Sequence, residues 1–131
     1  MTEALVATAA GVWAVDVDED ALLGPAPDAE VPPPSRESPF PRTVAAAQEG
    51  ALVLVVVERR PPLLVSRDAG ATWAEAGGGL PAGRAVAISP EHPDLVLYAG
   101  RNRLYVSRDG GRFWTALTPE LPEIAAVAFA S

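Results

Sequence analysis

The feature that most constrains the fold of this chain is an internal repeat. The pattern Ser-Arg-Asp-x-Gly-x-x-Trp occurs twice in 131 residues, as SRDAGATW at 66–73 and as SRDGGRFW at 107–114. The second copy starts 41 residues after the first. Either these residues perform the same chemistry twice or they build the same turn twice. A fixed period of this length is typical of architectures that stack copies of one small unit.

The similarity extends beyond the two motifs. At the same offset, LLVSRDAGATW aligns with LYVSRDGGRFW, and AVAIS from Ala85 aligns with AVAFA from Ala126. A third and more diverged copy opens the chain. The motif positions for Ser, Asp, Gly and Trp are there occupied by Asp16, Asp18, Asp20 and Leu23. A proline-rich insert at 24–42 lengthens this copy.

Each full copy predicts four short β-strands separated by turns. In the second copy the predicted strands are 43–47, 52–57, 63–65 and 72–76, where small or branched apolar residues dominate between Pro and Gly turns. No long amphipathic helical pattern is found in a chain with fourteen prolines and eleven glycines. Four strands in about forty residues, repeated, predict the blades of an all-β propeller.

The motif residues are interpreted as structural. Its Ser and Asp side chains can accept hydrogen bonds from backbone N–H groups of their own turn, and its Gly tolerates a positive φ. The Trp ring can then cover the hairpin and pack between neighbouring blades. This interpretation covers Ser66, Asp68, Gly70, Trp73, Ser107, Asp109, Gly111 and Trp114.

These motifs resemble the BNR or Asp-box repeat, Ser-x-Asp-x-Gly-x-x-Trp, and the resemblance spans nearly the whole chain. That family includes sialidases, sortilin-type receptors and photosystem II assembly factors, with folds of the WD40/YVTN/BNR-like kind. The resemblance implies that each motif joins the third and fourth strands of a blade, on the side away from the ligand-binding face. It thus favours a structural rather than a catalytic role for Asp68 and Asp109.

The repeat boundaries predict four segments: a degenerate blade at 1–42, blades at 43–83 and 84–123, and a closing strand at 124–131. The first copy lacks its first strand, and the closing strand has nothing after it. In the family such a strand commonly completes the first blade. Propellers typically have four to eight blades, so three are too few to close a ring. We therefore expect half of a six-bladed propeller, completed by homodimerisation, with 124–130 pairing with the partner's N-terminal blade.

Composition excludes several classes of function. The net charge of −7 argues against a nucleic-acid partner, and the chain has no Cys and a single His. The acidic stretch at 16–20 resembles the start of a calcium loop, but Ala21 and Pro27 stand where that loop needs Gly and Glu. We expect no metal and no cofactor. The start MTEALVATAAG has no signal-peptide pattern, and the apolar run 51–57 is too short to span a membrane, which predicts a cytoplasmic protein.

The predicted order of strands in each blade also places the charged residues on two opposite faces of the molecule. The motif turns are expected to share one face, with Arg67, Arg108 and Arg112 against ten acids, while the other face is near neutral. The second face is thus the better place for an acidic small molecule, glycan or protein. Its candidate binding residues are Arg59, Arg84, Arg101 and Arg103. The alternative is that these are ordinary solvated arginines.

Catalysis has less support in the sequence. By resemblance, a sialidase-like site needs an arginine cluster, a Tyr activated by a Glu and a loop Asp. Tyr98 and Tyr105 lie in no recognisable motif, and Asp28 is the one Asp expected on that face. The sequence therefore predicts a non-enzymatic binding or assembly scaffold. The alternative is a sialidase-like glycoside hydrolase whose site forms only in the oligomer.

Overall fold

The computed structural model describes residues 2–130, which form twelve β-strands and no helix. The strands make three four-stranded antiparallel sheets, so the prediction of an all-β fold is confirmed. Within this range there is consequently no helix long and apolar enough to cross a membrane. Met1 and Ser131, the last residue of the predicted closing strand, lie outside the described residues.

The first sheet joins both ends of the chain. Its strand order is β12-β1-β2-β3, with β12 at Ile124–Phe129, β1 at Glu3–Thr8, β2 at Gly11–Asp16 and β3 at Ala21–Pro25. The second and third sheets are meanders of consecutive strands. The second contains β4 Thr43–Glu49, β5 Leu52–Val57, β6 Leu63–Ser66 and β7 Ala74–Ala76. The third contains β8 Ala85–Ile88, β9 Val96–Ala99, β10 Leu104–Ser107 and β11 Thr115–Ala116.

The pairing of β12 corrects one prediction. We expected residues 124–130 to pair with the first sheet of a partner chain, but β12 pairs with β1 of its own chain, from Ala4 opposite Phe129 to Thr8 opposite Ile124. The physical reason is proximity. The third sheet, which precedes β12 in the chain, packs directly on the first sheet, so β1 lies within reach. The effective concentration of β1 near β12 of the same chain is therefore much higher than that of β1 from a second molecule, so pairing within the chain is favoured.

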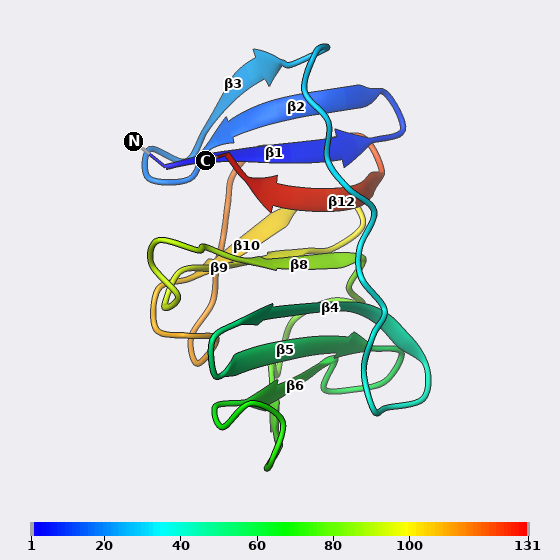
Figure 1. Cartoon of the computed structure of the whole chain (residues 1–131). Coiled ribbons are helices and arrows are strands. Elements are labelled where there is room, and N and C mark those ends of the chain that lie inside the picture. The colour runs from blue at the N-terminus through cyan, green and yellow to red at the C-terminus, as the bar shows by residue number, and fades with distance from the viewer. Residues whose placement is uncertain (1, 131) are drawn as a thin grey trace.

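The third sheet lies between the other two. Strand β8 contacts both β12 and β4, and these three strands run side by side through the middle of the molecule (Figure 1). The remaining strands of each sheet extend away from this line. Two apolar clusters fill the spaces between sheets. One, which includes Val6, Val15 and Leu97, joins the first sheet to the third, and the other, which includes Leu54 and Tyr98, joins the second to the third.

Alternation along the strands produces these clusters, because successive side chains point to opposite faces. In β9, the side chains of Val96 and Tyr98 face the second sheet, while those of Leu97 and Ala99 face the first. All four are fully buried. A sheet covered on both faces has a continuous apolar strand rather than an alternating one, as the sequence VLYA shows.

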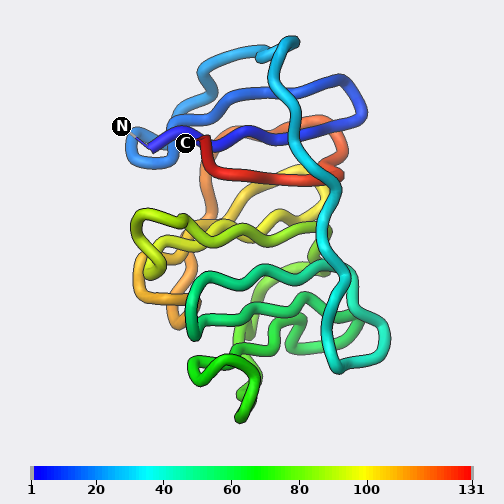
Figure 2. Tube along the Cα trace, in the orientation of Figure 1, coloured from blue at the N-terminus to red at the C-terminus, as the bar shows by residue number. Residues whose placement is uncertain are grey.

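The proline-rich segment at 26–42 connects β3 to β4. It runs along one end of the sheets, from the first sheet past β12 and β8 to the second (Figure 2). It is anchored to β4 by a bridge between Ser35 and Ala46, in which the Ala46 N–H donates to the Ser35 carbonyl at 2.7 Å. We call this end of the molecule the linker side. The opposite end carries the turns 17–20, 67–73 and 108–114, and we call it the box side.

Candidate ligand-binding site

The two repeated motifs form nearly identical turns on the box side. In the first, the Ser66 hydroxyl donates to Asp68 Oδ1 at 2.8 Å and accepts the Gly70 N–H at 2.7 Å. The Asp68 carboxylate also accepts the backbone N–H and the hydroxyl of Thr72. The indole N–H of Trp73 donates to the Gly70 carbonyl at 3.1 Å. Together these bonds close the turn on itself.

The second turn repeats this pattern. Ser107 donates to Asp109 Oδ1 at 2.7 Å and accepts the Gly111 N–H at 2.8 Å. Asp109 Oδ1 accepts the N–H groups of Arg112 and Phe113, each at 3.0 Å. The Trp114 indole donates to the Gly111 carbonyl at 3.0 Å. Both motif glycines have φ of +94°, a conformation that other residues adopt only with strain.

These hydrogen bonds lower the pKa of both motif carboxylates. Bonds from Thr72 and then from Ser66 lower the pKa of Asp68 to about 2. Bonds from the Phe113 N–H and then from Ser107 likewise lower the pKa of Asp109. A carboxylate committed to its own turn in this way is a poor general acid, because it stays ionised through the physiological range.

The diverged turn of the first sheet uses different bonds. Asp16 is buried and replaces the motif Ser, since its Oδ1 accepts the N–H groups of Asp18 and Glu19. Asp20 instead reaches the third sheet, where it accepts the backbone N–H and the hydroxyl of Thr118. The acids at 16–20 therefore hold a turn and a contact between sheets. Among residues 2–130, no group of three or more His, Asp and Glu side chains is placed to hold a metal ion.

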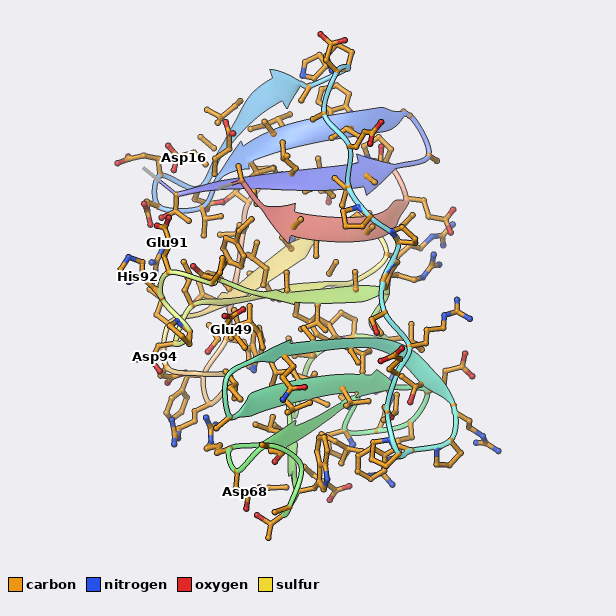
Figure 3. The ribbon with its side chains drawn as sticks, viewed as in Figure 1. Asp16, Glu49, Asp68, Glu91, His92 and Asp94 are labelled. Atoms are coloured by element: carbon orange, nitrogen blue, oxygen red, sulfur yellow. The ribbon has the colours of Figure 1, made fainter. Side chains whose placement is uncertain are left out.

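The box side is strongly acidic. Asp16, Glu91, Asp94 and Asp68 lie along one edge of the molecule, together with His92 (Figure 3). His92 is exposed in the β8–β9 turn, where its N–H donates to Ser89 Oγ and its carbonyl accepts the Leu95 N–H.

Three of the four predicted binding arginines are engaged in ion pairs. Arg59 lies 3.5 Å from Glu75, Arg84 lies 3.0 Å from Glu123, and Arg103 lies 2.9 Å from Glu120. These pairs are partly exposed, so each contributes little to stability and can be exchanged for a ligand group. Arg101 is exposed in the β9–β10 turn and has no carboxylate within 4 Å among residues 2–130.

Two of the four line cavities: Arg59 lines two near the β5–β6 turn, and Arg84 lines one at the centre of the linker side. The Arg84 cavity, of about 380 Å³, lies where the linker crosses the starts of β4, β8 and β12. Arg84 and Glu123 contribute from the third repeat, and Arg36 and Pro34 contribute from the linker. The structure therefore does not gather the four predicted arginines in one cavity. It combines Arg84 with Arg36, a linker arginine that was not among the four predicted binding residues.

The two tyrosines available to a sialidase-like site, Tyr98 and Tyr105, both pack in the core between the second and third sheets. Tyr98 is fully buried between the second and third sheets, its hydroxyl donates to the Pro81 carbonyl, and burial raises its pKa. Tyr105 packs edge-on against it, with ring centroids 6.1 Å apart. These contacts make both rings part of the apolar core.

Comparison of the sequence with models of known protein families and with curated proteins finds no match.

Proposed function

We propose that this protein is a non-enzymatic binding scaffold of the Asp-box propeller kind, which takes an acidic group in the linker-side cavity. The observation that carries the proposal is the placement of Arg36 and Arg84 in one cavity of about 380 Å³. A guanidinium group offers a planar fork of donors that matches a carboxylate. The repeated motifs support the family, since they close the same turn in the second and third sheets.

The charges of the cavity favour a monoanionic ligand group. Arg84 is already balanced by Glu123 at 3.0 Å, whereas Arg36 has no carboxylate within 4 Å among residues 2–130. One positive charge thus remains in the cavity. A carboxylate of a small molecule, a glycan or a protein side chain would neutralise it and share Arg84 with Glu123. Val44 and Ala125 add apolar contacts beside the charges.

Titration with glucuronic acid, sialic acid and citrate tests this proposal, with binding followed by NMR shifts of the arginine side chains. We expect the Arg36→Gln/Arg84→Gln double variant to bind at least roughly tenfold more weakly, and the difference to shrink as salt rises. Arg60→Gln is the matched control, because Arg60 lies on the linker side but outside this cavity. Equal affinity of the wild type and the double variant, or no binding of any probe, would contradict the proposal.

We also propose that two chains associate into a six-bladed ring, through sheet faces rather than through strand exchange. Each end of the three-sheet arc has an apolar face with no sheet beyond it. At one end this is the face of the second sheet turned away from β8, where Val55, Val57 and Leu64 are already buried in a cluster with Phe40, while Val53 and Trp73 remain partly exposed. At the other end it is the face of the first sheet opposite to Ala4 and Val6, formed by Leu5, Ala7, Val12, Ala14 and Ala128.

The surface area sets the expected strength of this association. The chain exposes 6913 Å², close to the roughly 6,600 Å² of an average monomer of its mass. Phe40 of the linker already covers part of the second-sheet face by packing on Trp73 at 4.8 Å between centroids. Phe40 would thus lie within the interface, and we expect a dimer that dissociates on dilution rather than an obligate one.

Light scattering over a concentration series tests the association. We expect the mass to approach twice 13.6 kDa, and Leu5→Glu to keep the chain monomeric by placing a charge on an end face. Phe113→Glu is the control, because Phe113 is 79% exposed on the box side and belongs to neither end face. A folded wild-type monomer at about 100 µM, or equal dimerisation of Leu5→Glu, would refute the ring.

A further inference from the structure

A second and larger cavity lies on the box side, where the sequence predicts only structural turns. It has a volume of about 520 Å³ and lies between the outer strand β7 of the second sheet and the motif turn of the third. Its polar lining includes two arginines from different repeats, Arg67 and Arg112. Its apolar lining includes Val65 and Trp73, and Glu75 lies further along β7.

The two arginines converge on Gly110. A methyl group built on Gly110 would lie 2.9 Å from Nη1 of Arg67 and 3.9 Å from Nη1 of Arg112, so both guanidinium groups flank the same point. Each is held by a backbone carbonyl. Arg67 Nη2 donates to the Gly110 carbonyl at 3.1 Å, and Arg112 Nη1 donates to the Asp109 carbonyl at 2.9 Å. These bonds orient the side chains and leave their charges in place.

The pair makes no close ion pair, although Asp94 and Asp109 lie near enough to act on the charge of Arg67. Within residues 2–130, neither Arg67 nor Arg112 has a carboxylate within 4 Å. Asp94 borders the same point beside Gly110, with its Oδ1 3.7 Å away, slightly closer than Nη1 of Arg112. Partial burial and then the charge of Arg112 lower the pKa of Arg67, while the charges of Asp109 and Asp94 act in the opposite direction.

The repeat supplies an internal comparison. Arg108 is the counterpart of Arg67 in the next copy of the motif, and its guanidinium is paired with Asp18 at 3.3 Å. Arg67 has no such partner and stands instead beside a second arginine. The arginine at this motif position therefore forms a surface ion pair in the third sheet, whereas in the second sheet it lies beside another arginine.

We propose that this cavity is a second binding site, which takes one oxyanion of an organic ligand between Arg67 and Arg112. Phosphate, sulfate and carboxylate share the chemistry that the two forks of donors recognise. Trp73 and Val65 provide an apolar wall for a ring or chain attached to that anion. The two arginines are together at one end of the cavity, so the ligand carries its charge at one end.

Titration with inorganic phosphate, phenyl phosphate and benzoate tests the site, followed by NMR of the Trp73 indole and the arginine side chains. We expect phenyl phosphate to bind more tightly than inorganic phosphate, because only the former reaches the apolar wall. Arg67→Gln and Arg112→Gln should each weaken binding at least roughly tenfold. Arg108→Gln is the matched control and should bind within about twofold of the wild type.

The ratio of phenyl phosphate to benzoate affinity distinguishes a phosphate site from a carboxylate site. Unchanged affinity in both Arg67→Gln and Arg112→Gln would overturn the proposal, as would shifts confined to Arg36 and Arg84. The Arg36→Gln/Arg84→Gln variant should bind phenyl phosphate normally, so failure of the linker-side site would leave this one standing.

Discussion

The motif turns of the second and third sheets have the same internal hydrogen bonds but different surroundings. In both, the Ser, Asp, Gly and Trp of the motif are bonded to one another within the turn. Trp114 then packs between two sheets, edge-on to Tyr98 with centroids 5.9 Å apart. Trp73 packs on the outward face of the second sheet, against Phe40 of the linker. The comparison separates what the motif does from what its place in the molecule adds.

A local turn and a tertiary contact respond differently to substitution. The Ser and Asp bonds are made within eight residues, so they form wherever the motif occurs. The contacts of the Trp ring depend on which sheet lies beyond it. For Trp114 that neighbour is a buried apolar cluster that includes Tyr98, while for Trp73 it is Phe40 of the connecting segment. Effects at the two Trp positions should therefore differ, and effects at the two Asp positions should match.

The largest effect is expected for Trp114→Ala, which removes a ring packed between the second and third sheets. We expect it to lower the free energy of unfolding by about 3 kcal/mol, and Trp73→Ala to lower it by about half as much. Chemical denaturation of both variants measures the difference. Equal losses would show that the surroundings of the two rings stabilise the fold to the same extent.

A smaller effect is expected for Asp109→Ala and Asp68→Ala. Each removes the acceptor of the turn's N–H groups, and each should lower the melting temperature by roughly 5 °C while leaving ligand binding at the linker side intact. Thermal melts of both variants check the match between the two turns. A loss of binding with no change in melting temperature would refute the structural role of these carboxylates.

The smallest effect is the dependence on pH. Both carboxylates have a pKa below that of the unfolded chain, about 2 for Asp68, so below pH 4 the unfolded state binds more protons. Their contribution to stability is complete above about pH 4 and is lost as the pH falls toward 2. Melting temperatures between pH 5 and 2 should fall less steeply in Asp68→Ala/Asp109→Ala than in the wild type. Parallel curves would contradict these pKa directions.

Part of this molecule could be predicted from its repeat. The all-β class, the segment 52–57 as a strand and the turn role of the motif residues follow from local rules, namely alternation and side-chain-to-backbone bonds. The missing first strand of the first copy also predicts that a closing strand at 124–131 completes an N-terminal blade, and β12 at Ile124–Phe129 completes the first sheet. The prediction that this strand pairs with a second chain was wrong. A repeat alignment shows which strands correspond, but not whether the strand comes from the same molecule or from another one.

Packing and convergence were decided by the tertiary structure alone. A Cβ on Gly83 would lie 2.5 Å from the Tyr98 hydroxyl and 2.6 Å from Val56 Cγ1, a closeness that no turn pattern indicates. Arg67 and Arg112, 45 positions apart, meet only because the second and third sheets pack face to face. Arg36 meets Arg84 only because the insert crosses the ends of three strands. Local bonds depend on neighbours along the chain, which the sequence specifies directly, whereas a binding cavity depends on which distant segments the core brings together.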